Sequence, residues 1–424
     1  MSRLERIAQQ LQGYDPQALS VPMAQRFLHQ LVNQCPALPA ESIAVGRALG
    51  RVLAQDITSP IAVPGHDNSA MDGYAFNSLD LAAQEVQHMV CVGHALAGQV
   101  WRGPALQFGQ CLRITTGAVM PHGLDTVVPL EFTQLHGDVV SWPSQAVQAG
   151  DNRRLAGEDI EKGSIALAEG TRLGPAELGL LASLGIPQVM VTRAPRVAYF
   201  STGDEILSLG DDHREGAVYD SNRYTMMGML KRLGCETVDL GVIADQPESI
   251  EAAFTQAAAL ADVIITSGGV SMGEADHTKA MMRRLGDVAF WRIAMRPGRP
   301  MAVGQMGQTL MFGLPGNPVA VMITFIAFVR PALLTLMGVP DVQPLMIRAK
   351  SLEVLRKKPG RTEYQRGCLS RDANQQLWIK TTGNQGSGVL SSMVHADGLI
   401  VLHHEQGSVA VGDEVDVMLL DSCL

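Results

Sequence analysis

The stretch VIITSGGVSMGEADHTK at residues 263–279 decides the fold of this chain. It begins with a short β-branched apolar run, which predicts a buried strand. The run breaks at Ser267-Gly268-Gly269, where the backbone can turn sharply and expose N–H groups. An acidic pair and Lys279 follow, just before an apolar helical pattern. A strand, a glycine turn and the start of a helix together predict a cradle for an anion, phosphate above all.

Carboxylates beside such a cradle can hold a divalent cation, so Asp276 is a candidate metal ligand. The alternative interpretation is an ordinary turn between a strand and a helix, with its charges in solvent. Short glycine-rich turns are common, so these residues alone leave both interpretations open.

The bulk composition excludes several classes of protein. A chain of 424 residues favours about three domains, and 46% apolar residues provide well-filled cores. The net charge of −9 argues against a general nucleic-acid binder or a protein of acidic membrane surfaces. Six scattered cysteines without CxxC or zinc spacing indicate free thiols in a reducing cytoplasm.

The sequence predicts neither a signal peptide nor a membrane-spanning helix. Residues 1–12 carry charges throughout, so they are no signal peptide, and residues 1–20 as a whole predict a loose tail. The longest apolar run, 318–329, stops at Arg330-Pro331 and is too short to span a bilayer, which favours a buried helix. We therefore expect a cytoplasmic protein.

From Arg196 onward strands alternate with helices, which predicts a parallel, doubly wound sheet. Asp220 is the expected N-cap of one helix with Gly234 as its C-cap, and Asp245 begins a sequence that resembles a capping box. Ligands of such sheets bind where the strands end. Four candidate segments fall at predicted strand ends: Thr202–Glu205, Asp245, Ser267–Gly269 and Gly316–Asn317.

Outside that region the pattern is β-like. Residues 77–150 are short apolar runs separated by glycines, and one run ends at Thr116. The preceding loop, 60–76, has two aspartates, an asparagine and a serine within residues 67–72. These acceptors suit a metal or a hydroxylated substrate, although turn chemistry alone explains many such loops. Short strands resume after Pro340, and the glycine-rich segment 383–388 is either a loop that reaches a ligand or a plain connector.

Three arginines, Arg292, Arg296 and Arg299, stand within eight residues of this acidic chain. Arginine grips phosphate or another tetrahedral oxyanion with two donors at once, so they predict a local basic patch. The alternative is a solvated strand and turn.

An ordered series of motifs from about residue 22 to the end resembles the molybdopterin molybdenumtransferases, the bacterial MoeA family related to the C-terminal domain of gephyrin. Each motif alone is weak, but the series is specific. The motifs are DNSAMDGYA (67–75), TGA (116–118), GEDI (157–160), STGDE (201–205), SGGVS (267–271), GEAD (273–276), LPGNP (314–318), GSG (386–388) and SSM (391–393).

The resemblance implies a multidomain α/β plus β chain that forms a homodimer. A central doubly wound αβα domain at 179–335 binds molybdopterin, and a small C-terminal β-barrel occupies 340–424. A β-rich domain at 61–149 is inserted into a discontinuous linking domain of 22–60 plus 150–178, while 1–21 is an N-terminal extension. In the family the cleft lies between the αβ domain of one subunit and the inserted domain of the other.

The implied reaction is the final step of molybdenum cofactor biosynthesis. Adenylated molybdopterin and molybdate enter, and the molybdenum-bearing cofactor and AMP leave. Breaking an adenylyl–phosphate linkage needs charge neutralisation and positioning more than a protein nucleophile, and no nucleophilic triad stands out. The implied catalytic residues are Asp72, Thr116, Glu205, Asp245 and Asp276, of which Glu205, Asp245 and Asp276 hold Mg²⁺.

The implied substrate-binding residues surround that centre. Amides of the glycine turn would cradle the terminal phosphate of the pterin, basic residues would bind phosphate or molybdate, and Thr116 would donate a hydrogen bond across the cleft. The full set is Ser267, Gly268, Gly269, Lys279, Arg292, Arg296, Arg299, Pro315, Gly316, Asn317, Asp220, Asn222 and Ser387.

The sequence differs from the family pattern at a few positions, and two alternative functions stay open. Arginine replaces the family's frequent lysine at 292, 296 and 299, which predicts a shift in preference between molybdate and tungstate. One alternative function is a molybdopterin adenylyltransferase, although that family is essentially the αβ domain alone. The other is a gephyrin-like dimeric scaffold. Molybdopterin adenylyltransferase and molybdoenzyme apo-proteins or their chaperones are the expected partners, with no nucleic acid and no membrane.

Overall fold

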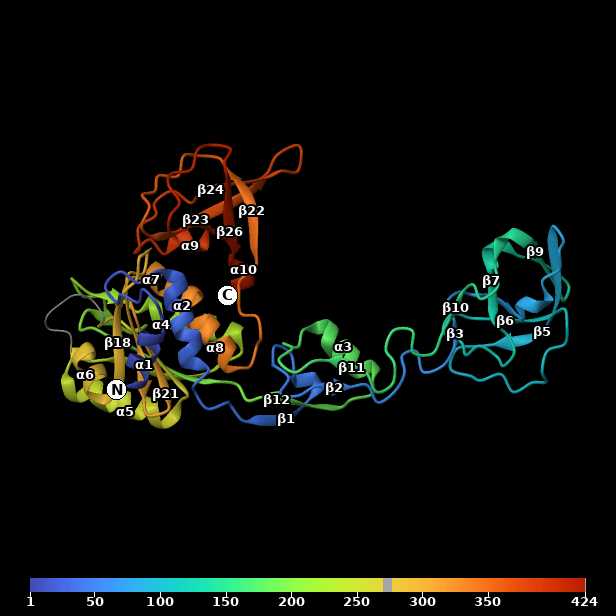
Figure 1. The fold of residues 1–424 in the computed structure, drawn as a ribbon, viewed down its shortest axis with the longest axis horizontal. Helices are drawn as coiled ribbons and strands as arrows, with labels where there is room; N and C mark the ends of the chain where they lie inside the picture. Colours follow the sequence, from blue (N-terminus) through green and yellow to red (C-terminus); the bar gives the residue numbers. More distant parts are fainter. Residues whose placement is uncertain (270–276, 424) are drawn as a thin grey trace. The chain divides into compact units, whose positions relative to one another are not determined.

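The computed structural model describes residues 1–269 and 277–423. Its chain forms two compact units (Figure 1). The first comprises residues 1–54, 170–174 and 189–424, and the second comprises 55–169 and 175–188.

The first unit is built on a six-stranded sheet in the order β16-β13-β17-β21-β20-β18. Helices connect the first three of these strands along the chain. The strands are β13 (Arg196–Thr202), β16 (Glu236–Ile243), β17 (Val263–Ser267), β18 (Asp287–Arg292), β20 (Pro300–Met306) and β21 (Thr309–Leu314).

The expected parallel sheet is correct for β16, β13, β17 and β21, but β20 runs antiparallel to β21. The reason is a tight hairpin between Met306 and Thr309, where Gly307 takes a positive φ of 61°. A two-residue connection cannot make the crossover that a parallel pair needs. Because β18 is antiparallel to β20 in turn, it again points the same way as β17.

Helices cover both faces of this sheet. Alternate residues of β13 point to opposite faces, so Tyr199 packs with α4 (Ser221–Leu233), while Phe200 packs with α5 (Pro247–Leu260) and α6 (His277–Leu285). The doubly wound αβα domain is therefore confirmed.

Two of the three predicted helix caps are confirmed. Asp220 accepts a hydrogen bond from the Arg223 N–H at the start of α4, and Gly234 ends the same helix with a φ of 92°. The capping box at Asp245 is wrong: the residue before α5 is Gln246, so Asp245 stands one position too early to cap the helix, and no side-chain cap forms.

The apolar run 318–329 belongs to a continuous buried helix of 19 residues. Within the described ranges it is one helix long and apolar enough to cross a membrane, but 72% of its apolar window is buried in the unit's core. Thr324 donates its hydroxyl proton to Ala320 O and Val321 O where the helix widens. The segments are α7 (Pro318–Thr324), a π-helical stretch (Phe325–Val329) and α8 (Arg330–Leu336).

The N-terminal residues are not the loose tail that their polarity predicts. They form α1 (Arg3–Gln10), which begins with a capping box between Ser2 and Glu5 and buries Leu4 and Ile7. Helix α2 (Val21–Val32) follows, and Leu4 and Ile7 of α1 pack in the same hydrophobic core as the buried residues of α2. A helix of eight residues is marginal alone, so tertiary packing, which local polarity does not report, decides the outcome.

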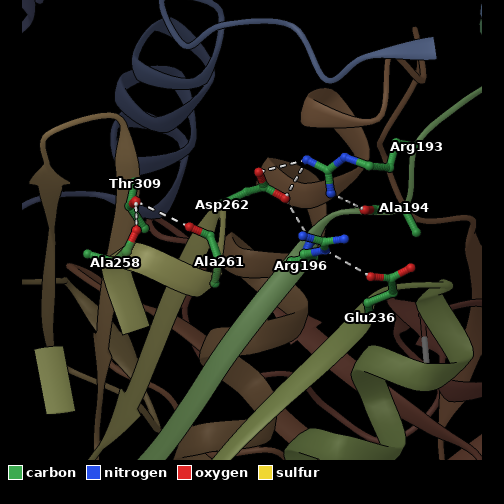
Figure 2. Close-up of polar contacts among 8 residues, drawn as sticks. All are labelled: Arg193, Ala194, Arg196, Glu236, Ala258, Ala261, Asp262 and Thr309. Carbon is green, nitrogen blue, oxygen red and sulfur yellow. Dashed lines mark hydrogen bonds and ion pairs between the residues drawn. The ribbon is translucent and has the colours of Figure 1, made fainter. Parts of the chain in front are cut away.

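The amino end of the sheet anchors the connector from β12 (Gln188–Thr192) into β13 (Figure 2). Arg193 Nη2 contacts both carboxylate oxygens of Asp262 at 2.8 and 3.0 Å, and the Arg196 N–H donates to Asp262 Oδ2. This contact raises the pKa of Arg193. The amino end is thus occupied by structural ion pairs, which leaves the carboxyl ends of the strands for a ligand.

A small β-barrel completes the first unit, as expected. Five strands close on themselves through the pairs β23–β24, β24–β22, β22–β26, β26–β25 and β25–β23. The short strand β19 (Met295–Arg296) joins the barrel by pairing with β23. The barrel strands are β22 (Met346–Ser351), β23 (Thr362–Arg371), β24 (Leu377–Thr381), β25 (Gly398–Leu402) and β26 (Glu414–Leu419).

The second unit is β-rich, as predicted for residues 61–149. Its sheet has the order β7-β4-β6-β5-β9-β8 and carries a core on each face, with Phe76 against Trp142 in one of them. Segments before and after this sheet pair with each other, at β3–β10 and β2–β11, and α3 (Pro175–Ser183) follows. The strands are β2 (Ile57–Thr58), β3 (Asn68–Ser69), β4 (Gly73–Phe76), β5 (Val86–Ala95), β6 (Gln110–Ile114), β7 (Thr126–Pro129), β8 (Gln134–His136), β9 (Val139–Pro143), β10 (Arg153–Arg154) and β11 (Ile165–Leu167).

Candidate functional site

The predicted strand-end segments do meet at one edge of the first unit's sheet. Ser201 is in register with Ser267, and Ser267 is in register with Leu314. The turns that follow β13, β17 and β21 are therefore neighbours. The N–H of Gly268 donates to Leu314 O at 3.2 Å, and a Cβ on Gly316 would lie 3.9 Å from the Gly268 Cα.

The turn after β17 requires glycine at both positions. Gly268 and Gly269 have φ values of 89° and 63°. A Cβ on Gly268 would lie 2.6 Å from Thr202 O, and one on Gly269 would lie 2.5 Å from the Thr278 Cβ. Close backbone packing thus explains both residues, as an anion cradle would.

Two expected contacts of this turn differ in the structure. The Gly268 amide is paired with Leu314 O, so it fixes the turn instead of pointing to a phosphate. The Ser267 hydroxyl is buried and lies 2.6 Å from Tyr199 Oη, which also contacts Ser201 Oγ at 2.9 Å. Burial raises the pKa of Tyr199, so its hydroxyl stays neutral. Strand alternation turns Ser267 inward, and sequence alone did not reveal its partner.

Asp220 and Asn222 line up at the start of α4, next to the turn after β21. The Asn222 amide donates to Gly316 O at 2.7 Å, so this predicted pair is brought to the predicted Gly316. Two buried acceptors there, Asp220 Oδ2 and Asn222 Oδ1, have no partner among the described residues. Buried acceptors normally have a donor, so these two oxygens fit the N–H groups of a ligand ring.

The acidic residues are only partly brought together. The Asp245 N–H donates to Asp204 Oδ1 at 3.3 Å, and the Glu205 carboxylate lies over Gly203, where a Cβ would approach its Oε2 to 2.7 Å. Glu205 and Asp245 thus follow neighbouring strands, β13 and β16. The third predicted metal ligand, Asp276, lies outside the described residues. Within the described ranges no three acids, histidines or cysteines form a metal cluster.

The three arginines lie on different elements. Arg292 ends β18 and lines a cavity of about 380 Å³ together with Lys279 of α6. Arg296 lies in β19 beside barrel strand β23. Arg292 and Arg296 lie on different sheets because the chain passes from the central sheet to the barrel between them. For Arg299 the structure gives a backbone contact, since its carbonyl accepts from the Ile293 N–H.

Arg366 of β23 is a candidate site residue that the sequence motifs did not indicate. It is fully buried, and its guanidinium donates to Ser392 Oγ at 2.9 Å and to Gly386 O at 3.0 Å. Among the described residues its Nη1 has no partner. Burial, and secondarily the charge of Arg296, lowers the pKa of Arg366 to about 10. The available signal was a lone arginine in an otherwise strand-like run, TEYQRGCLS at 362–370.

The predicted loop residues Ser387, Asn317 and Pro315 adjoin this arginine or the turn after β21. Ser387 O accepts from the Val319 N–H at the start of α7, and Asn317 is the N-cap residue of α7 without a side-chain cap bond. Pro315 directly follows β21. The loop 383–388 is therefore docked, and it brings two of its carbonyls to Arg366. A cationic guanidinium with an open donor, beside a second arginine, is able to bind a tetrahedral dianion.

In the second unit, Asp72 and Thr116 meet although 44 residues separate them. The Thr116 N–H and hydroxyl both donate to Asp72 Oδ1, at 2.7 and 2.9 Å. The backbone bond, followed by the hydroxyl bond, lowers the pKa of Asp72, which remains an exposed carboxylate. Thr116 thus donates within its own unit. In the loop that contains Asp72, the Ser69 hydroxyl donates to the nearby Met71 O.

The first unit thus combines a doubly wound domain that has a glycine corner with a β-barrel, and the second unit is β-rich, which defines a multidomain α/β plus β protein. Residues 198–335 match the probable molybdopterin binding domain. Residues 19–185 match the MoeA N-terminal region (domain I and II), and residues 348–420 match the MoeA C-terminal region (domain IV). The chain belongs to the MoeA family of molybdopterin molybdenumtransferases.

Individual relatives agree. The chain is 39% identical over 390 residues to the molybdopterin molybdenumtransferase of Haemophilus influenzae, covering 92% of this chain and 96% of that protein. It is 33% identical to the Bacillus subtilis enzyme of that name, covering 90% of each. The crystal structure of the molybdopterin biosynthesis MoeA protein of Pyrococcus horikoshii OT3 shares the fold, with a TM-score of 0.80 at 24% identity over 95% of this chain and 100% of that chain.

Proposed function

We propose that this protein inserts molybdenum from molybdate into adenylated molybdopterin and releases AMP, the final step of molybdenum cofactor biosynthesis. Membership of the MoeA family supports the reaction. The observation that carries it is the buried Arg366 with an open Nη1, next to Arg296, because such a pair matches a doubly charged oxyanion.

The first unit also offers complementary groups for the pterin. The buried oxygens Asp220 Oδ2 and Asn222 Oδ1 have no donor among the described residues and would accept hydrogen bonds from the ring N–H and amino groups of a pterin. Gly316, which accepts from Asn222, places the turn after β21 beside them. These contacts orient the substrate, which is the main task when the reaction needs positioning rather than a nucleophile.

Mg²⁺ fits the acids of this unit. Glu205 and Asp245 follow adjacent strands and supply the carboxylate oxygens that Mg²⁺ prefers. Asp276 would complete the set. When bound, Mg²⁺ would neutralise charge on the phosphate linkage that breaks. In the second unit Thr116 donates to the Asp72 carboxylate and lowers its pKa, and Asp72 is the catalytic residue that this unit would supply.

The remaining expectations are part of this proposal. The protein acts in the cytoplasm as a homodimer. Each subunit has the domains that the family resemblance implies. It receives its substrate from a molybdopterin adenylyltransferase and serves molybdoenzyme apo-proteins or their chaperones. Sedimentation of the purified chain tests the homodimer directly, and a monomer at micromolar concentration would contradict it.

The decisive experiment measures AMP release from adenylated molybdopterin with and without molybdate. We expect molybdate-dependent release together with a molybdenum-bearing product. The rival adenylyltransferase function predicts instead that molybdopterin plus ATP yields the adenylated compound. A scaffold without enzymatic activity would give neither product.

A further inference from the structure

Two cysteines of the second unit face each other across neighbouring strands. Strands β5 and β6 pair in parallel, and Cys91 of β5 is in register with Cys111 of β6 (Figure 1). Residues directly opposite each other on paired strands project to the same face of a sheet. Cys111 is buried in the core that contains Phe76 and Trp142, and Cys91 packs against that same core. The two thiols therefore share one side of the sheet.

The thiols are also in direct contact. Burial raises the pKa of the Cys111 thiol, and the charge of Cys91 and a hydrogen bond between the two side chains raise it further. Paired strands lie about 4.8 Å apart, and a disulfide spans Cα atoms that are roughly 4.4–6.8 Å apart. The spacing of β5 and β6 at this position therefore permits a disulfide.

The strand pairing is irregular beside these cysteines. The register shifts between Cys91 and His94, because His94 pairs with Arg113 and not with the residue that an unbroken ladder would place opposite it. An extra residue on β5 thus interrupts the ladder, and the Cys91 thiol donates to Gly93 O at 3.5 Å within this irregular stretch. A covalent link between Cys91 and Cys111 would hold the two strands together where their backbone pairing is interrupted.

The two thiols differ in their access to solvent. Cys111 is fully buried, whereas Cys91 is partly exposed. A small molecule in solution therefore reaches Cys91 first, and Cys111 lies behind it as the second thiol. Cys368 of the barrel provides a comparison, because it is also partly exposed but the position opposite it on β24 is occupied by Lys380.

We propose that Cys91 and Cys111 are a dithiol modification site, which a low-molecular-weight disulfide such as glutathione disulfide converts to a reversible protein disulfide. In a reducing cytoplasm the pair remains as two thiols, and the protein disulfide forms when glutathione becomes oxidised. The inference concerns the second unit alone and does not depend on the proposed reaction.

The modification is a sequence of two thiol–disulfide exchanges. The Cys91 thiol loses its proton and its sulfur attacks one sulfur of glutathione disulfide, so that one glutathione leaves as a thiol. The Cys111 thiol then loses its proton and its sulfur attacks Cys91 Sγ, which releases the second glutathione as a thiol. Two protein thiols are thereby oxidised to one disulfide, and one glutathione disulfide is reduced to two glutathione molecules.

The cross-link would brace the second unit without disturbing its candidate site. Strand β6 pairs with β4 along its other edge, where Ile114 is in register with Gly73, and the contact between Thr116 and Asp72 lies beyond that pair. A disulfide that encloses residues 92–110 removes conformational freedom from the unfolded chain. We therefore expect the oxidised protein to melt several degrees above the reduced protein.

The test uses the unaltered full chain. The folded protein is incubated with glutathione disulfide, the remaining thiols are blocked with N-ethylmaleimide, and the protein is digested with trypsin. Arg102 separates the two cysteines, so they leave on different peptides, 52–102 and 103–113. Mass spectrometry without reductant distinguishes a disulfide between these peptides from a glutathione adduct on either one.

We expect the linked peptides to exceed the glutathione adduct of Cys91 by at least about tenfold, because the second exchange is intramolecular. Cys368 should carry the glutathione adduct instead of a protein disulfide. Dithiothreitol should separate the linked peptides and return the melting temperature to that of the reduced protein. A glutathione adduct that persists on Cys91 without linked peptides would overturn the proposal, as would a Cys91 that does not react.

Two variants test the order of the exchanges. Cys111→Ala should retain glutathione on Cys91, because the second thiol is missing. Cys91→Ser should leave Cys111 unmodified, because Cys111 is buried. The linked peptides of the unaltered protein remain decisive if either variant fails to fold. None of these measurements uses AMP release, so the modification site and the proposed function succeed or fail separately.

Discussion

Replacing Arg366 by methionine should abolish molybdate binding while leaving the fold intact. The guanidinium is fully buried, the described residues provide no acidic partner for it, and burial lowers its pKa from the usual value to about 10. That depression means that the folded state disfavours the charged form by about 3 kcal/mol at neutral pH. The unfolded chain binds the guanidinium proton more tightly than the folded chain does, so stability rises as pH increases above about 10.

Against this penalty stand the hydrogen bonds that the side chain donates. The two short ones, to Ser392 Oγ and Gly386 O, are each worth about 1.5 kcal/mol, since the donor is charged. Relief of the buried charge and loss of these bonds therefore nearly cancel. We expect Arg366→Met to change the free energy of unfolding by less than about 2 kcal/mol.

Molybdate should separate the variant from the unaltered protein. At a hundred times its Kd, a ligand stabilises the folded state by about 2.7 kcal/mol, which is a shift of several degrees in melting temperature. We expect that shift in the unaltered protein and none in Arg366→Met, measured by thermal unfolding with molybdate. Arg371→Met is the control, because Arg371 lies on the same strand β23 but is exposed. A molybdate-dependent shift that persists in Arg366→Met would refute the reasoning, as would a variant that fails to fold.

Three further predictions concern the glycine corner and the second unit. Gly268→Ala should destabilise the protein by at least about 2 kcal/mol in urea unfolding, because its Cβ would lie 2.6 Å from Thr202 O at a φ of 89°. Gly228→Ala in α4 is the control. A Cβ at position 228 meets nothing within 4 Å, so this change should stabilise the protein by about 0.5–1 kcal/mol. Tyr199→Phe should cost about 1–3 kcal/mol, since Ser267 loses its 2.6 Å partner, and an unchanged urea midpoint would contradict this role. Asp72 should titrate below the usual pKa of an aspartate, as measured by NMR. Any stabilisation from its ionised form is therefore lost as pH falls through that lowered pKa. Thr116→Val should move the pKa of Asp72 only part of the way back, because the hydrogen bond from the backbone N–H remains.

The sequence by itself determined the order of the elements and the family. Apolar periodicity and glycine punctuation located the strands of the doubly wound domain, the buried helix after Asn317 and the β-rich regions on either side. These features depend on residues close together in the chain, so local rules are sufficient to predict them. The same rules failed for residues 1–20, whose helix is stabilised by burial of Leu4 and Ile7 in a core assembled from distant segments.

Only the tertiary structure decided what the candidate residues contact. It brought Thr116 to Asp72 and turned Ser267 towards Tyr199. It also placed Arg292 and Arg296 on strands of different sheets, and it buried the Arg366 guanidinium, for which the described residues provide no acidic partner. The physical reason is that hydrogen bonds and desolvation depend on distances between side chains far apart in the sequence, which no local pattern encodes.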